Sequence, residues 1–218
     1  MTTDSGWPPD IVTTTVPAGL LAWARSSPRL RDAWPSCPRA DWLLWIAKLS
    51  AESDLAHQRC VLAACTVARE MLSSVPPLEW ELPERTLAAA EQWARTPDAG
   101  DDLTEVLEAL RSLDDELDDL RLRILAASAF GALHERLAFH VGSVVGAAAA
   151  LADQGARGTD GADAVADLFD HLSRVRGLLG DAASEGLTPH ALVDSVRDAL
   201  GSAALFSAPE QRAQLRPA

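Results

Sequence analysis

Residues 101 to 125 read DDLTEVLEALRSLDDELDDLRLRIL, and this stretch carries the strongest periodic signal of the sequence. Its apolar residues recur at alternating spacings of three and four, which is the heptad pattern of an amphipathic helix. Asp101 and Asp102 stand where carboxylates cap a helix and complement its dipole. The segment therefore predicts one long helix whose apolar seam must be buried. The seam consists of Leu103, Val106, Leu110, Leu113, Leu117, Leu120 and Ile124.

The sequence leaves two possible partners for this seam. Within the chain, the residues after Ala162 predict another amphipathic helix, which could return antiparallel to the first. A second copy of the chain could instead cover the seam and form a homodimer. We expect the intramolecular packing, because the later helix offers a matching apolar face made of Leu168, Leu172, Val175 and Leu179.

An acidic run flanks the seam. Ten acidic residues stand between Asp98 and Asp119, against Arg111 alone. The plainer interpretation is a solvated helix face, and the functional one is an anionic surface that docks a cationic partner and relieves self-repulsion. The candidate partner-binding residues are Asp114, Asp115, Glu116, Asp118 and Asp119.

The rest of the second half also predicts helices. The seam helix could continue through Gly131 towards Gln154, or break at Gly131, and Gly142 and Gly146 would allow a neighbouring helix to approach closely. The stretch 155–161 is a loop by composition. Thr188-Pro189 is expected to open a final helix, which carries Leu192, Val196 and Leu200 and is followed by a frayed tail over residues 207–218.

The first half predicts short helices introduced by proline, which suits a first helical turn. We expect helices at about residues 17–25, 28–34, 38–49, 52–74 and 84–95. No segment requires a β-sheet, so the fold class is an all-α multi-helix bundle. All seven tryptophans fall before Thr96, and four are expected to share one N-terminal core: Trp34, Trp42, Trp45 and Trp93.

Composition divides the chain near Thr96. Residues 1–96 hold all the tryptophans and cysteines and carry a net charge of −2, whereas residues 97–218 are rich in Ala and Leu and carry −11. We therefore expect a Trp-rich helical domain followed by an acidic helical bundle region. The single lysine, Lys48, is given no role, because the excess of Arg and Ala suggests codon bias.

Charge and composition exclude several function classes. The acidic second half repels nucleic acid and anionic membranes. The longest apolar stretch, Val141–Ala152, is about twelve residues long, short of the roughly 20 that span a bilayer. The N-terminal segment lacks the basic and apolar regions of an export signal. Three cysteines are an odd number, so reduced thiols and a cytoplasmic location are expected.

The clearest candidate for metal chemistry is weak. His134-Glu135 is similar to the start of a zinc-protease motif, but the next histidine is His140. Six positions rotate a side chain by about 240° around a helix, whereas ligands four positions apart share one face. Nor does the glycine-rich stretch 155–161 carry the lysine of a phosphate-binding loop. We expect solvated or core-edge histidines, and neither metal nor nucleotide.

Two further groups could begin a catalytic site. Asp54, His57 and Cys60 place a carboxylate, an imidazole and a thiol at helical spacing, which could begin a metal site or provide a nucleophile with its base. Asp167 and His171 are four apart, which more often gives a surface hydrogen bond. Neither group has a partner cluster, so we expect core packing for the first and predict no catalytic residue and no cofactor.

The run Ala33–Trp45, AWPSCPRADWLLW, resembles a segment of bacterial immunity proteins of polymorphic toxin systems, which have Ala-Trp, then Cys, then Asp-Trp-Leu-Leu-Trp. The helix Pro83–Arg95 is similar to the proline-led helix of that family that ends in Trp-Ala-Arg. The resemblance covers about residues 20–96, and Thr96 stands where the family has glycine. It implies an α-helical inhibitor or adaptor that binds a cognate effector protein.

These observations leave three candidate functions. The first is a non-catalytic protein-binding module of the immunity or antitoxin kind, which binds a basic protein through the acidic second half. The second is a scaffolding protein that self-associates or joins a larger assembly through the heptad seam. The third, least supported by residue spacing, is a metal- or thiol-dependent enzyme. The identity of the partner is not encoded in these patterns.

Overall fold

The computed structural model describes residues 19–49, 54–75, 81–96, 102–127, 133–156, 162–180 and 187–201. In this part of the chain all regular structure is helical, so the all-α prediction is confirmed. The frayed tail expected over residues 207–218 lies outside the described residues. The short elements are α1 (Leu20–Ala24), α2 (Leu30–Ala33), a 3-10 turn at Trp34–Ser36, α3 (Ala40–Leu49) and α9 (Val193–Leu200). The long helices are α4 (Asp54–Ser74), α5 (Glu81–Arg95), α6 (Asp102–Ala126), α7 (Leu133–Ala156) and α8 (Ala162–Leu179).

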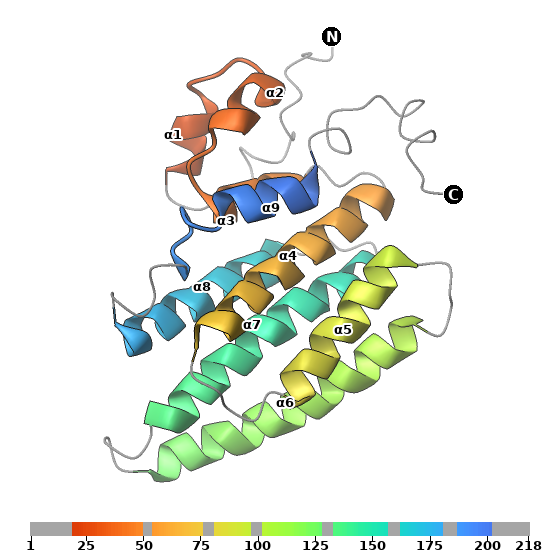
Figure 1. The fold of residues 1–218 in the computed structure, drawn as a ribbon, viewed down its shortest axis with the longest axis vertical. Coiled ribbons are helices and arrows are strands. Elements are labelled where there is room, and N and C mark those ends of the chain that lie inside the picture. The colour runs from red at the N-terminus through yellow and green to blue at the C-terminus, as the bar shows by residue number, and fades with distance from the viewer. Residues whose placement is uncertain are drawn as a thin grey trace.

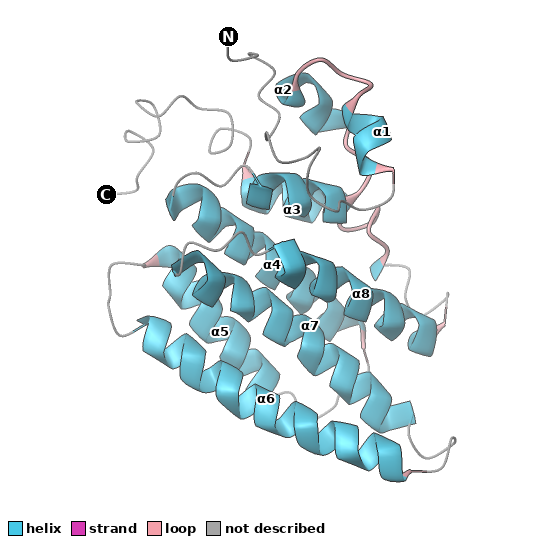
Figure 2. Ribbon diagram, turned by 180° about the vertical axis from the view of Figure 1, so that it is seen from behind, coloured by secondary structure: helices cyan, strands magenta, loops and turns pink. Residues whose placement is uncertain are grey.

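The five long helices run side by side as a bundle, with α3 and α9 along one edge and α1 and α2 beyond them (Figure 1). Helix α7 is central, since it packs against α4, α5, α6 and α8. From the opposite side, α7 is seen between α8 and α6 (Figure 2). Helix α6 ends at Ala126, α7 begins at Leu133, and the two pack on each other, so they are two helices and not one continuous helix; Gly131 lies outside the described residues.

The heptad seam is covered within the chain, but not by the expected helix. Helix α6 packs against α5 and α7, whereas α8 packs chiefly against α7. The choice of α8 as the partner of the seam was therefore wrong. Val106, Leu113 and Leu120 are buried, and Leu110 and Leu117 pack on the core from its edge. The predicted apolar face of α8 is confirmed, since Leu168, Leu172 and Val175 are buried, but this face packs on the central helix α7 and not on α6.

The tryptophan core is confirmed and is larger than expected. Trp34, Trp42, Trp45 and Trp93 are each at most 8 % exposed and belong to one cluster of buried residues. That cluster continues through α6, α7, α8 and α9, so the compositional boundary near Thr96 does not interrupt the core. Trp23 adds to it from α1, with its ring centroid 5.8 Å from that of Trp42.

The final helix begins later than Thr188-Pro189 predicts. Residues 187–192 form a 3-10 start and turns, and α9 begins at Val193. The carbonyl of Pro189 accepts a hydrogen bond from the N–H of Ala40, at 3.0 Å. The turn thus satisfies a free donor at the start of α3, where intrahelical partners are lacking. Leu192, Val196 and Leu200 are buried as expected.

Helix α7 is apolar throughout its middle. By length and composition alone, Leu133–Gln154 is one helix of the described chain that could cross a membrane. Half of its most apolar window is buried inside the bundle, and the core helix of a globular protein passes the same test. Its burial against four neighbours is typical of such a core helix.

Glycine brings α6 close to α7, as the sequence suggested. A methyl group built on Gly142 would lie 2.7 Å from Cδ2 of Leu117, closer than carbon atoms pack. A methyl group on Gly146 would lie 3.6 Å from Cδ2 of Leu113, which is ordinary contact. The seam of α6 therefore rests directly on the glycine face of α7.

These two glycines form a matched pair for mutation. Gly146→Ala is expected to raise the free energy of unfolding by about 0.5–1 kcal/mol, because alanine costs less backbone entropy in a helix and fits here. Gly142→Ala should be about 1 kcal/mol less stable than Gly146→Ala, because Leu117 must move. Urea unfolding followed by circular dichroism measures both. Equal stability of the two variants would contradict the close contact at Gly142.

Candidate functional site

The acidic run of α6 forms an open surface. All five candidate binding residues, Asp114, Asp115, Glu116, Asp118 and Asp119, are exposed. Helix α6 lies at the edge of the bundle, so this surface is unobstructed by other described helices (Figure 1). We call these five residues the acidic face.

The acidic face is not neutralised within the described part of the chain. No ion pair there joins any of its five carboxylates to a cation. The pKa of Asp114 is raised, first by partial burial and then by the charges of Asp118 and Asp115. The raised pKa means that the charged form of Asp114 is disfavoured, chiefly by partial burial and in smaller part by its acidic neighbours.

The sign of the charge on α6 changes after Leu120. Arg121 and Arg123 follow the acidic face, and both side chains are exposed. Leu122 and Leu125 are also exposed here, at 64 % and 77 %. Cations near a helix C-terminus are favoured by the helix dipole, which accounts for the arginines but not for the leucines.

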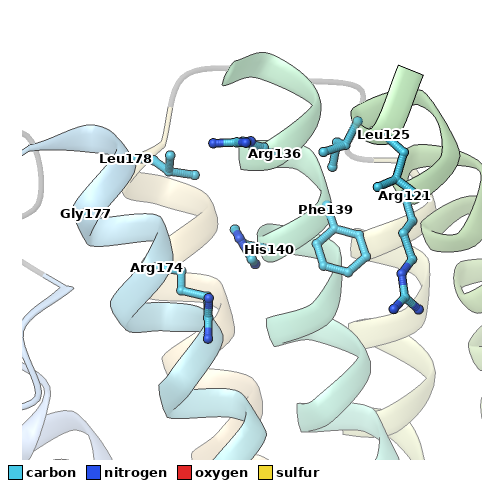
Figure 3. Close-up of a pocket in the computed structure, with 9 residues that line it drawn as sticks. Arg121, Leu125, Arg136, Phe139, His140, Arg174, Gly177 and Leu178 are labelled. Carbon is cyan, nitrogen blue, oxygen red and sulfur yellow. The ribbon is translucent and has the colours of Figure 1, made fainter. Parts of the chain in front are cut away.

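Beside this end of α6 lies a pocket of about 630 Å³. Helix α7 forms its floor, and α6 and α8 form its two sides (Figure 3). The pocket combines three arginines and a histidine with an apolar surface. It is lined by Arg121, Ile124, Leu125, Arg136, Phe139, His140, Arg174, Gly177 and Leu178.

Two histidines meet at the edge of this pocket. Nδ1 of His140 on α7 lies 2.9 Å from Nδ1 of His171 on α8. One ring must carry its proton on Nδ1 and donate, while the other accepts. Burial, followed by the charges of His171 and Arg174, lowers the pKa of His140 to about 4, and burial also lowers the pKa of His171. Both rings are therefore neutral at pH 7.

This pair replaces the two associations considered from the sequence. His134 is exposed, whereas His140 lines the pocket, so the two do not share a site. His171 pairs with His140, although the charge of Asp167 still acts on it. Among the described residues, no group of three or more His, Cys, Asp or Glu side chains could hold a metal ion. The expectation that no metal binds stays a prediction.

A second polar site lies inside the core. Nζ of Lys48 on α3 lies 2.7 Å from Nδ1 of His57 on α4, and Nε2 of His57 lies 2.7 Å from the carbonyl oxygen of Leu151 on α7. A carbonyl only accepts, so Nε2 carries the proton and Nδ1 accepts from the ammonium group. Both side chains are buried. The contacts join three helices, a role for Lys48 that the sequence did not suggest.

The thiol candidate is not activated. Cys60 is fully buried, and burial raises the pKa of its thiol to about 12, with the Lys48 charge lowering it only in part. A protonated thiol is a poor nucleophile. Both ring nitrogens of His57 are engaged by Lys48 and Leu151, so this ring is not oriented as a base towards Cys60. Burial also raises the pKa of Cys37 to about 11.

Comparison with family models, with curated proteins and with solved structures gives no match to this chain. The resemblance to bacterial immunity proteins therefore stays an expectation. The residues that carry it are largely internal, since all four tryptophans in its two segments are buried.

Sequence reasoning missed the pocket and both histidine contacts. The three arginines of the pocket are spread over 54 positions, from Arg121 to Arg174, and each alone is an ordinary surface cation. The local signal was the change from acidic to basic residues after Leu120, which is hidden in the net charge of residues 97–218. The single Lys48 on an otherwise apolar helix face was the signal for the buried contact.

We expect Lys48→Met to lower the free energy of unfolding by about 1–3 kcal/mol, because the substitution leaves the buried Nδ1 of His57 without its donor. Urea unfolding measures this. Arg111→Gln, at an exposed position of α6, is the control and should change stability by less than about 0.5 kcal/mol. A fully stable Lys48→Met variant would show that the contact with His57 contributes nothing.

Because the pKa of His140 is lowered in the native chain, we expect the free energy of unfolding to fall in acid. The unfolded chain takes up a proton at His140 near the ordinary pKa of 6.5, whereas the native chain does so only near 4. Acid therefore favours the unfolded state, and stability falls as the pH drops from about 6.5 towards 4. We expect a loss of about 1 kcal/mol between pH 7 and pH 5, because partial exposure reduces the effect.

Unfolding measured across this pH range is the test. His140→Gln should flatten the pH dependence, while His134→Gln, at an exposed site on the same helix, should leave it unchanged. Equal slopes for the wild type and His140→Gln would contradict a lowered pKa of the half-buried His140.

Proposed function

We propose that this protein is a non-catalytic protein-binding protein of the immunity or antitoxin kind, which binds a basic protein through the acidic face of α6. One observation carries the proposal: Asp114, Asp115, Glu116, Asp118 and Asp119 are exposed together, and within the described residues no cation pairs with them. Such a surface costs self-repulsion in the free protein. A cationic partner relieves that repulsion.

The placement of the acidic face supports docking. It lies on an outer helix whose opposite side is anchored in the core by Val106, Leu113 and Leu120. Rigid presentation of a binding surface limits the ordering entropy that association costs. The net charge of −13 adds long-range attraction for a basic protein and raises its association rate.

The resemblance fits this division of roles. In its two segments, Trp34, Trp42, Trp45 and Trp93 are buried and therefore maintain the fold instead of touching a partner. The recognition surface then falls in the second half, where the charge is concentrated. A cytoplasmic location is part of the proposal; it is supported by the three free, buried cysteines, which are typical of a reducing compartment.

The structure gives less support to self-association through the heptad seam. The seam already rests on α5 and α7, and opening it would expose Val106 and Leu113 to water. A second copy could use it only after α6 had left the bundle.

The test is charge reversal on the acidic face. Asp114, Asp115, Asp118 and Asp119 are changed together to Lys, and binding to the native partner, captured with the wild type and then purified, is measured by surface plasmon resonance. We expect the association rate to fall by about 10- to 1,000-fold at low salt and its salt dependence to shrink. The fold should be retained, because all four side chains are exposed.

The control reverses four exposed acidic residues elsewhere: Glu84, Asp163, Asp167 and Asp198. It changes the net charge by the same amount, so a specific face and a general charge effect are separated. If both variants lose the same amount of association rate, the acidic face acts only through the net charge of the protein and is not a specific binding surface. Unchanged binding by the variant with Lys at positions 114, 115, 118 and 119 would contradict the proposal.

A further inference from the structure

The pocket between α6, α7 and α8 has a charge opposite to that of the protein. The chain carries −13, yet Arg121, Arg136 and Arg174 line this pocket, one from each helix. None of the described residues that line it is acidic. Only Arg174 forms an ion pair there, with Asp170 at 2.8 Å. The pocket therefore keeps an excess of positive charge.

The remaining lining is apolar. Phe139 lies in the middle of the pocket on α7, with Leu125 above it on the α6 side and Leu178 on the α8 side (Figure 3). Leu125 is 77 % exposed, which leaves a large apolar surface in water. A ligand that covered Leu125 and Phe139 would gain hydrophobic free energy on binding.

The cations lie on both sides of this apolar surface. Arg136 and Arg174 are on the α8 side, together with the neutral His140, and Arg121 is on the α6 side beside Phe139 (Figure 3). Guanidinium groups bind carboxylates and phosphates by paired N–H donors. The volume of about 630 Å³ lies within the range of small-molecule sites.

We propose that this pocket binds a small organic anion, whose carboxylate or phosphate group is held by Arg136 on the α8 side and whose apolar body lies on Phe139, Leu125 and Leu178. A small ligand is favoured over a polyanion such as nucleic acid, because the acidic face ends at Asp119, two residues before Arg121, and therefore adjoins the pocket. A long anionic chain would have to cross Asp118 and Asp119 and be repelled. The site is independent of the proposed binding of a basic protein.

Two dyes test the proposal on the whole chain. 8-Anilinonaphthalene-1-sulfonate has an aromatic body with one anionic group, and N-phenyl-1-naphthylamine has the same body without the charge. Fluorescence titration should show one site per chain that binds the sulfonate more tightly. Equal or tighter binding of the uncharged dye would overturn the role of the arginines.

Variants locate the site. Arg136→Gln should weaken sulfonate binding about tenfold, as expected for the loss of one charged hydrogen bond, and leave the uncharged dye little affected. The matched control is Arg123→Gln, an exposed arginine of α6 outside the lining, which should bind as the wild type does. If Arg123→Gln weakens binding as much as Arg136→Gln, the dye responds to general charge and the pocket is not its site.

Gly177 offers a second pair that does not alter charge. A methyl group on Gly177 would meet no atom within 4 Å, so Gly177→Ala should leave the pocket open. Gly177→Phe should fill it and abolish binding of both dyes. Thermal unfolding by circular dichroism checks that each variant is folded. Undiminished dye binding by a folded Gly177→Phe variant would overturn the assignment to this pocket.

Displacement of the bound sulfonate dye identifies the anionic group. Dodecanoate and dodecyl phosphate are compared with dodecanol, which shares their alkyl chain. Displacement by either anion at a concentration at least tenfold below that of dodecanol supports the proposal, and the more effective anion identifies the head group. Equal displacement by all three, or none by any, would overturn it.

Discussion

The small side chains of α7 are the constraint on which the rest of the bundle depends. Four long helices pack against this one helix, and that is possible because much of its surface is Ala, Gly or Val. At Gly142 the neighbouring Leu117 occupies the space that a side chain would need. Close packing of this kind gains dispersion energy along the whole contact but leaves little room for substitution. The apolar character of α7 follows from its position and needs no membrane.

The same arrangement separates charges along α6. Its buried seam fixes the helix against α5 and α7, so the acidic residues must face outward. Beyond Leu120 the helix passes the start of α7 and the end of α8, and here the exposed side chains are basic or apolar. One helix thus presents an anionic surface suited to a basic protein and one wall of a cationic pocket. The two surfaces are adjacent but chemically opposite.

Buried and half-buried polar contacts join parts of the bundle that are distant in sequence. Lys48 and His57 tie α3 and α4 to the carbonyl of Leu151 on α7, and His140 and His171 tie α7 to α8. A buried polar group without a partner costs free energy, so each contact favours one arrangement of the helices over others of similar packing. The contact of His140 with His171 joins α7 to α8, two of the three helices that line the pocket.

The sequence by itself determined the all-α class, the long helix at Asp102–Ala126, the burial of Trp34, Trp42, Trp45 and Trp93, and the exposure of the acidic run. These features are local, because the spacing of apolar and charged residues along one helix determines which of its sides is buried. Only the tertiary structure decided which apolar faces meet. The buried faces of α5, α7 and α8 are all largely apolar, so the pattern on α6 did not distinguish among them. The pocket, the histidine pair and the contact of Lys48 each require side chains from different helices, and such contacts are set by the packing of the whole chain.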